Sequence, residues 1–179
     1  MMFHLPSAIP TPSLLRLAVG VSILTGLTAA SAAAQENEYS VKAAFLINFL
    51  KFIDWPGGSG PYVIEVAGKN PFGSTLDKMV ENRTINGRKV VVQYGHSSGL
   101  TPSILFVPAS ESEHFGDYLQ YQSKPIVVVG ESAGFASKYG VINFVRDHDR
   151  VAFEINARRA KSSGVKVSSR LLQLAKIVD

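Results

Sequence analysis

The chain has 179 residues, of which 46% are hydrophobic and 18% are charged, with 18 lysines and arginines against 14 aspartates and glutamates. This composition is sufficient to bury the core of one domain, or two at most, and it excludes general disorder. The absence of cysteine excludes disulfide scaffolds, thiolate zinc sites, iron–sulfur clusters and cysteine nucleophiles. It does not indicate a cytosolic protein, because the N-terminus carries an export pattern.

Residues 1–34 are predicted to form a secretory signal peptide. Arg16 is the only formally charged side chain in this segment, and it precedes an apolar stretch over 17–29. Ala32 and Ala34 supply the small side chains that signal peptidase requires at its cleavage site. The apolar stretch is too short to span roughly 30 Å of hydrocarbon, which argues against a membrane anchor. We therefore expect cleavage near Ala34 and an exported domain over 35–179.

A helix is the first element expected in the exported domain, over residues 41–55. This stretch lacks the alternation of a strand, and Pro56 and Gly57 follow it. Its residues are so largely apolar or aromatic that one buried helix face would not account for them. Core packing is the main interpretation of these residues, and a protein contact is the alternative. The contact candidates are Phe45, Phe49, Phe52 and, at the helix end, Trp55.

Strands and shorter helices are predicted to alternate after this first helix. The strands are expected at 62–66, 89–94, 104–107, 126–129, 141–145 and 151–155. The helices are expected at 70–81, 110–121, 130–140, 156–163 and 170–178. The expected caps are Asn70 with Pro71, Ser110 or Ser112, and Ser168 or Ser169. A turn is predicted at Asn86–Gly87 and a hairpin around 146–150.

Short apolar strands separated by helices indicate βαβ units. The predicted fold is a single α/β domain, a three-layer open sheet that is mostly parallel and has helices on both faces. The hairpin around 146–150 should add an antiparallel pair of strands at one edge of this sheet.

The loop Gly68–Thr75 has the glycine spacing of a P-loop. Ser74 stands where that motif needs a lysine, and Pro71 removes a backbone N–H donor. An ordinary strand-to-helix turn is therefore the main interpretation of the loop. The alternative is a site for a small anion or a nucleotide-like ligand at the start of the helix. The candidate ligand-binding residues are Asn70, Phe72, Gly73 and Ser74.

Catalytic and metal-binding patterns are weak throughout the chain. His96, His114 and His148 are isolated from one another, and the residues at 147–149 fit the tip of a hairpin. His114 and Asp117 are expected to form a solvated pair on one helix face, and no Gly-x-Ser-x-Gly elbow occurs. The chain is therefore predicted not to be an enzyme, and no metal or cofactor is expected.

The C-terminal segment 156–179 carries six basic residues and one acidic residue. It can be a set of solvated helix faces, or a docking surface for an acidic partner, an anionic ligand or the membrane surface. Glu154 is expected to pair with one of these bases. The modest charge of the whole chain and its predicted export argue against nucleic acid as a partner. The partner-binding candidates are Trp55, Arg158, Arg159 and Arg170.

Several motifs, taken in chain order, resemble the YfiR-like family of exported bacterial regulators. The strongest match is Phe153–Ala160 leading into Ser168–Ala175. The other matching segments are Tyr39–Phe49 with Trp55–Pro56, Asn70–Gly73, Ile104–Val107 and Gly140–Phe144. The resemblance covers essentially the whole of 35–179.

This resemblance implies a periplasmic inhibitor that binds the periplasmic domain of an inner-membrane diguanylate cyclase and represses cyclic di-GMP synthesis and biofilm formation. It also implies a homodimer and an outer-membrane lipoprotein that can sequester the inhibitor. The best-known member carries disulfides that make it redox-responsive, a control that is impossible here because the chain has no cysteine. A different class of function, a periplasmic sensor or carrier of a small anion or nucleotide-like ligand, is the alternative.

Overall fold

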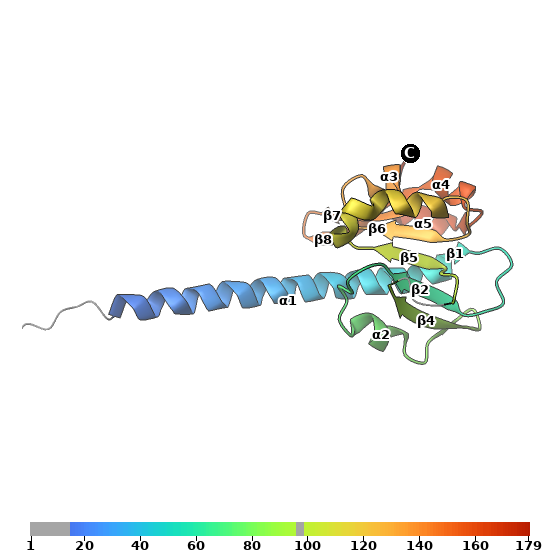
Figure 1. Cartoon of the computed structure of the whole chain (residues 1–179). Coiled ribbons are helices and arrows are strands. Elements are labelled where there is room, and N and C mark those ends of the chain that lie inside the picture. Colours follow the sequence, from blue (N-terminus) through green and yellow to red (C-terminus); the bar gives the residue numbers. More distant parts are fainter. Residues whose placement is uncertain (1–14, 96–98) are drawn as a thin grey trace, which may run out of the picture. The chain divides into compact units, whose positions relative to one another are not determined.

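The computed structural model describes residues 15–95 and 99–179, and side chains from residue 34 onward outside 96–98. The chain divides into two units, Met1–Asn37 and Glu38–Asp179. The long helix α1 (Leu15–Phe52) begins in the first unit and ends in the second (Figure 1). Among the described residues, no helix is both long and apolar enough to cross a membrane.

The second unit contains the whole sheet and the shorter helices. Its first half has β1 (Ile53–Asp54), β2 (Tyr62–Val66), α2 (Thr75–Val80), β3 (Thr84–Ile85), β4 (Arg88–Tyr94) and β5 (Ile104–Val107). A 3₁₀-type segment, η1 (Ala109–Tyr121), follows. The second half has β6 (Val127–Gly130), α3 (Phe135–Lys138), β7 (Ile142–Asp147), β8 (Arg150–Asn156), α4 (Ala157–Ser162), β9 (Lys166–Val167), α5 (Ser169–Leu174) and β10 (Lys176–Val178).

The main sheet has the strand order β10-β8-β7-β6-β5-β2-β4-β3. Neighbouring strands are parallel except in the pairs β7–β8 and β3–β4, which confirms the predicted mostly parallel α/β sheet. The predicted hairpin is the pair β7–β8, but β10 adds to its outer side, so the hairpin is not the last pair of the sheet. The parallel strands place their carboxyl ends along one edge, where ligands of open α/β sheets ordinarily bind.

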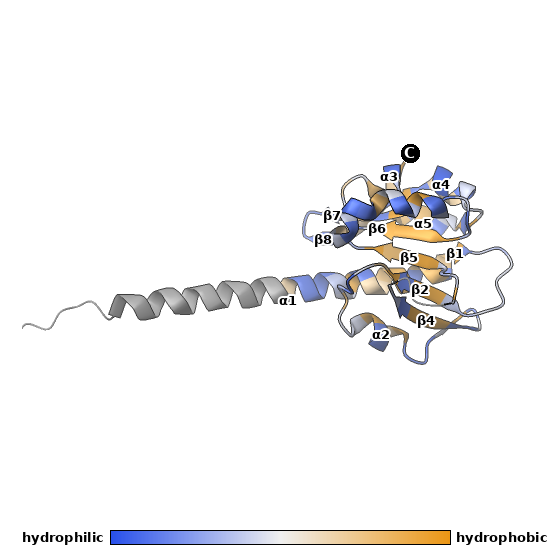
Figure 2. Ribbon diagram, viewed as in Figure 1, coloured by the Kyte–Doolittle hydropathy of each residue, from blue (hydrophilic) through white to orange (hydrophobic). Residues whose placement is uncertain are grey.

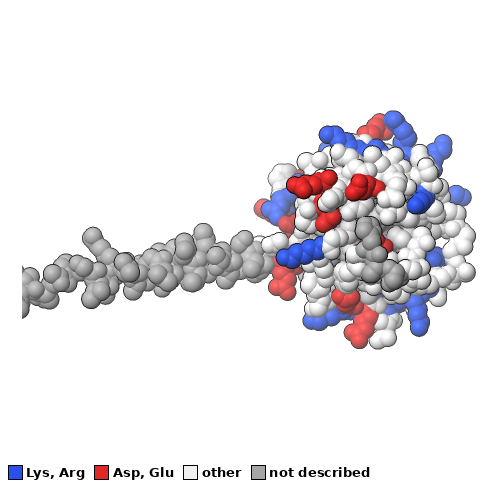
Figure 3. All heavy atoms as spheres, viewed as in Figure 1, with Lys and Arg blue, Asp and Glu red and all other residues white. Residues whose placement is uncertain are grey.

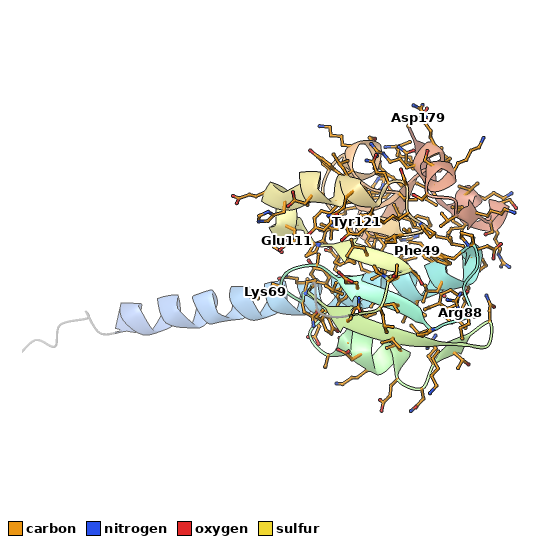
Figure 4. All side chains as sticks on the ribbon, turned by 45° about the vertical axis from the view of Figure 1, so that its right-hand side comes forward. Phe49, Lys69, Arg88, Glu111, Tyr121 and Asp179 are labelled. Carbon is orange, nitrogen blue, oxygen red and sulfur yellow. The ribbon has the colours of Figure 1, made fainter. Side chains whose placement is uncertain are left out.

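The apolar side chains of α1 pack into the core on one face of the sheet. Phe49 is fully buried and lies in the interior in Figure 4. Its ring centroid is 5.2 Å from that of Phe153 and 5.9 Å from that of Phe144. A second core cluster, built around Phe115 and Phe135, packs on residues of β5 and β6, two strands that are hydrophobic along their length in Figure 2. The core-packing interpretation of the first helix is thus confirmed for Phe49.

The predicted extension of the first helix to Trp55 is wrong. Helix α1 ends at Phe52, and Ile53 and Asp54 form β1, which pairs antiparallel with β9. Helices usually end at or before the residue that precedes a proline, which here is Trp55 before Pro56. The fully buried Ile53 pairs with Val167 of β9. At this point the chain therefore makes a tertiary contact in place of a last helical turn.

The C-terminal helix also ends earlier than predicted. Ser168 is its N-cap as expected, because the Ser168 side chain accepts a hydrogen bond from the Leu171 N–H at 3.3 Å. Helix α5 ends at Leu174, Ala175 is extended, and Lys176–Val178 forms β10 alongside β8. The backbone of β8 supplies hydrogen-bond partners to residues 176–178. A helical pattern in the sequence cannot show that such partners are nearby.

Three predicted helix starts differ in the structure. Helix α2 begins at Thr75, because Asn70 caps the preceding turn and not the helix. The segment expected to be capped by Ser110 or Ser112 begins after Pro108 with no side-chain cap and is 3₁₀ in type. Helix α3 begins only at Phe135, after Gly134 adopts a φ of +73°, a conformation that favours glycine.

Candidate functional site

A cavity of about 300 Å³ lies in the C-terminal part of the domain, between α4, β9 and α5, and we call it the C-terminal groove. Three of the residues that line it are small: Ala157 and Ala160 on α4, and Gly164, which follows that helix with a φ of +75°. Its lining residues are Ala157, Ala160, Lys161, Gly164, Val165, Lys166, Val167 and Leu172. The groove therefore combines a small apolar floor with two lysines.

Two of the predicted partner-binding arginines, Arg158 and Arg170, are exposed on α4 and α5, the two helices that contribute residues to this groove. The Arg158 side chain is 76% exposed, and its guanidinium lies 3.8 Å from the carboxylate of Asp179, the last residue of the chain, which is labelled in Figure 4. This distance is long for an ion pair. Arg170 is exposed, and its guanidinium carbon lies 5.8 Å from the centre of the Phe52 ring. Both cations are weakly engaged within the chain, so they are accessible to a partner.

The other two predicted partner-binding residues are held by internal contacts. The Arg159 guanidinium donates to the Ser137 and Lys138 carbonyls, at 3.2 and 2.7 Å, and so ties α4 to the end of α3. Trp55 is partly buried, donates from its indole N–H to the Ser103 carbonyl at 3.1 Å, and packs edge-on against Tyr62. These contacts give both side chains a structural role.

The loop Gly68–Thr75 is closed by its own asparagine. The Asn70 amide donates to the Gly73 carbonyl at 2.8 Å, and its oxygen accepts the Phe72 backbone N–H at 2.8 Å. The Phe72 ring is buried, whereas Gly73 and Ser74 are exposed. Because the Asn70 amide and the Phe72 N–H are used inside the turn, the loop has the arrangement of an ordinary strand-to-helix connection.

The histidine patterns match their structural interpretations. His114 Nδ1 lies 3.6 Å from Asp117 Oδ2, with both side chains well exposed, as expected for a solvated pair. His148 is at the hairpin tip with a φ of +55° and contacts the adjacent Asp147. His96 lies outside the described residues. Within the described part of the chain, no group of three histidine, aspartate or glutamate residues is placed to hold a metal ion.

Sequence reasoning missed a cluster of four charged side chains and one tyrosine at the carboxyl edge of the sheet, and we call it the carboxyl-edge cluster. It consists of Glu38, Tyr39, Lys42, Glu131 and Arg146. The buried Lys42 ammonium lies 2.6 Å from Glu38 Oε1 and 2.7 Å from Glu131 Oε2. Glu131 Oε1 accepts from the Tyr39 hydroxyl at 3.1 Å and from the Ala109 N–H at 2.9 Å.

The electrostatics of this cluster follow from its contacts. The hydrogen bond from Lys42 lowers the pKa of Glu38, with Arg146 adding to the effect. Burial raises the pKa of Tyr39, and the neighbouring Glu131 carboxylate raises it further. Two features of the sequence could have indicated the cluster: Lys42 within an apolar helix, and Glu131 directly after β6. No local sequence pattern shows that these two side chains meet.

The model of the YfiR/HmsC-like family matches residues 39–176 of this chain, from α1 into β10. A search of characterised proteins gave no significant match to the chain. The family consists of periplasmic regulators, linked to diguanylate cyclases and cyclic di-GMP signalling, rather than of enzymes. The match covers nearly all of the second unit and all of its strands except the last two residues of β10, so the chain belongs to the YfiR/HmsC-like family.

Proposed function

We propose that this protein is a periplasmic negative regulator. It binds the periplasmic domain of an inner-membrane diguanylate cyclase and thereby represses cyclic di-GMP synthesis and biofilm formation. The observation that carries this proposal is the family match across 39–176. The export pattern over 1–34 supports it, since a domain released by cleavage near Ala34 would meet the cyclase outside the cytoplasm.

We place the partner contact at the C-terminal groove and its basic rim. Arg158 and Arg170 are exposed on α4 and α5, the helices that contribute residues to the groove, and Lys161 and Lys166 line it. An apolar floor surrounded by cations fits a partner that inserts an apolar side chain and presents acidic groups around it. Arg159 and Trp55 contribute by keeping α3, α4 and the first strand in place.

Deletion of the gene tests the proposal directly. With the partner cyclase expressed, we expect cellular cyclic di-GMP and biofilm mass to rise, and the wild-type gene to restore both to their original level. The double variant Arg158→Glu/Arg170→Glu should fold but fail to restore repression, because reversed charges at an interface repel the partner. An unchanged cyclic di-GMP level after deletion would contradict the proposal.

Arg83→Glu is the matched control for the double variant. Arg83 is an exposed arginine between α2 and β3, in a part of the domain that contributes nothing to the groove. This variant should repress like the wild-type protein. Full repression by the groove double variant, at equal protein level, would refute the assignment of the contact surface while leaving the regulatory function standing.

Two further partners are part of the proposal: a second copy of the chain, and an outer-membrane lipoprotein that sequesters the regulator. Light scattering of the protein purified from the periplasm should give the mass of a dimer. Co-purification from a periplasmic and membrane extract should recover the cyclase and the lipoprotein. N-terminal sequencing of the same sample should begin near Gln35 if the signal peptide is cleaved as proposed.

A further inference from the structure

A second cavity, of about 290 Å³, lies against the carboxyl-edge cluster. Its apolar wall is formed by Phe144, Val145 and Val151 of the β7–β8 hairpin, and its charged wall by the four ionised residues of the cluster. The cavity is at the edge of the sheet where strand β6 ends, which is the usual position for ligands in open α/β sheets. Its volume is at the small end of the range for ligand pockets, roughly 300–1,000 Å³.

The two carboxylates of the cluster are held very differently. The Glu131 side chain is only 4% exposed and accepts three hydrogen bonds, so it is a fixed part of the wall. The Glu38 side chain is 28% exposed and bridges Lys42 and Arg146, at 2.6 Å from each. Rotation of the Glu38 side chain into solvent would break two side-chain contacts, whereas Glu131 is buried and is also held by a backbone N–H.

Departure of Glu38 would change the charge of the cavity wall in a defined way. Lys42 and Arg146 would then face Glu131 alone, which leaves one positive charge without compensation. Lysine has three N–H donors, and Arg146, whose side chain is 70% exposed, presents its guanidinium at the cavity. A single carboxylate placed between these two cations would restore neutrality and reproduce the hydrogen bonds that Glu38 makes.

We propose that this cavity binds a small monocarboxylate with an apolar body, and that the Glu38 carboxylate occupies the place of the ligand carboxylate in the free protein. The ligand carboxylate bridges Lys42 and Arg146, and its apolar body lies on Val145 and Val151. The site is separate from the C-terminal groove and its test uses the purified protein without cyclase. Its success or failure is therefore distinguishable from that of the proposed function.

Calorimetric titration with hexanoate and benzoate tests this site, using protein purified from cells that express the full chain. Glu38→Ala should bind both carboxylates about tenfold more tightly than the wild-type protein, because the competing internal carboxylate is gone. Arg146→Gln should weaken binding about tenfold, because one of two charge-assisted contacts is lost. Hexylamine and hexanol should not bind comparably to any of these proteins.

Two matched variants control for charge and helix effects. Glu36→Ala removes an exposed glutamate from the same helix, and Arg83→Gln removes an exposed arginine away from the cavity. Both should bind the carboxylates with wild-type affinity. Ala133→Trp, at the exposed wall of the cavity, should abolish binding while keeping all four charges.

Three outcomes would overturn the site. The first is a Glu38→Ala protein that unfolds cooperatively but binds no more tightly than wild type. The second is undiminished binding by Arg146→Gln or Ala133→Trp. The third is a carboxylate-induced methyl shift in the NMR spectrum at Val165 and Val167 of the C-terminal groove instead of Val145 and Val151.

Discussion

The carboxyl-edge cluster and the C-terminal groove both have basic side chains in or near them, but they differ in how these charges are held. In the cluster, the Lys42 side chain is 7% exposed and lies within 2.7 Å of two carboxylates. On α4, Arg158 and its ion-pair partner Asp179 are both more than three-quarters exposed and 3.8 Å apart. Basic side chains of this exposed kind project at the rim of the space-filling view (Figure 3).

This difference indicates a division of roles. A buried, paired charge is costly to unpair, so the cluster ties α1 to the loops that follow β5 and β6. An exposed cation adds little to folding but remains available to a partner. We therefore expect substitutions in the cluster to change the free energy of unfolding, and those at the groove to change binding.

The largest effect should come from Lys42→Met. This change leaves Glu131 buried without its cation, and breaking a buried pair costs about 3–5 kcal/mol. Urea unfolding of the variant and the wild-type protein measures the difference. Lys161→Met, at an exposed lysine beside the groove, is the control and should stay within about 0.5 kcal/mol of wild type. If the two variants lost the same free energy of unfolding, the proposed difference between the carboxyl-edge cluster and the C-terminal groove would be wrong.

The next effect concerns Asn156, which caps α4, a helix that lines the groove. Its side-chain oxygen accepts the Arg159 N–H at 2.9 Å to cap α4, and its amide donates to the Ala136 carbonyl at 3.1 Å. Asn156→Ala should cost about 1–2 kcal/mol, because the cap is lost. The Asn156→Ser variant keeps a neutral capping oxygen and should recover part of this loss. A urea midpoint identical to wild type for Asn156→Ala would refute the capping role.

A smaller effect is expected from acid, through Glu38. Its pKa is lowered in the folded protein by Lys42, so its stabilising contribution is present above the unfolded pKa and is lost as pH falls through the folded pKa. The difference in melting temperature between wild type and Glu38→Ala should therefore shrink from neutral pH to about pH 3. A difference that is constant over this interval would mean that the Glu38 charge contributes nothing.

The smallest effect on stability is expected for Arg158→Ala. Its side chain is largely exposed and its ion pair is long, so the free energy of unfolding should change by less than about 0.5 kcal/mol. Capture of the cyclase by the immobilised protein should nevertheless weaken. Normal stability with normal capture would remove Arg158 from the proposed contact surface.

Sequence patterns predicted the strands well and the helix ends poorly. Runs such as Ile104–Val107 are short, apolar and followed by proline, so their state and length are determined locally. The end of α1 and the start of β10 depend on partners elsewhere in the chain, β9 and β8, that supply backbone hydrogen bonds. Similarly, Arg159 and Arg170 look alike in the sequence, because both are basic residues in the same C-terminal segment. The packing of α4 against α3 is what brings the Arg159 guanidinium to two backbone carbonyls of α3.

Periodicity, local turn chemistry and ordered motifs were enough to predict the α/β class, the order of the longer strands, a serine cap at 168 or 169 and the family. Which charges meet depends on the tertiary structure. Lys42 and Glu131 are 89 residues apart, and they meet because α1 packs across the sheet while parallel pairing brings β6 to the same edge. Side-chain encounters of this kind depend on strand order and register, which no local pattern encodes.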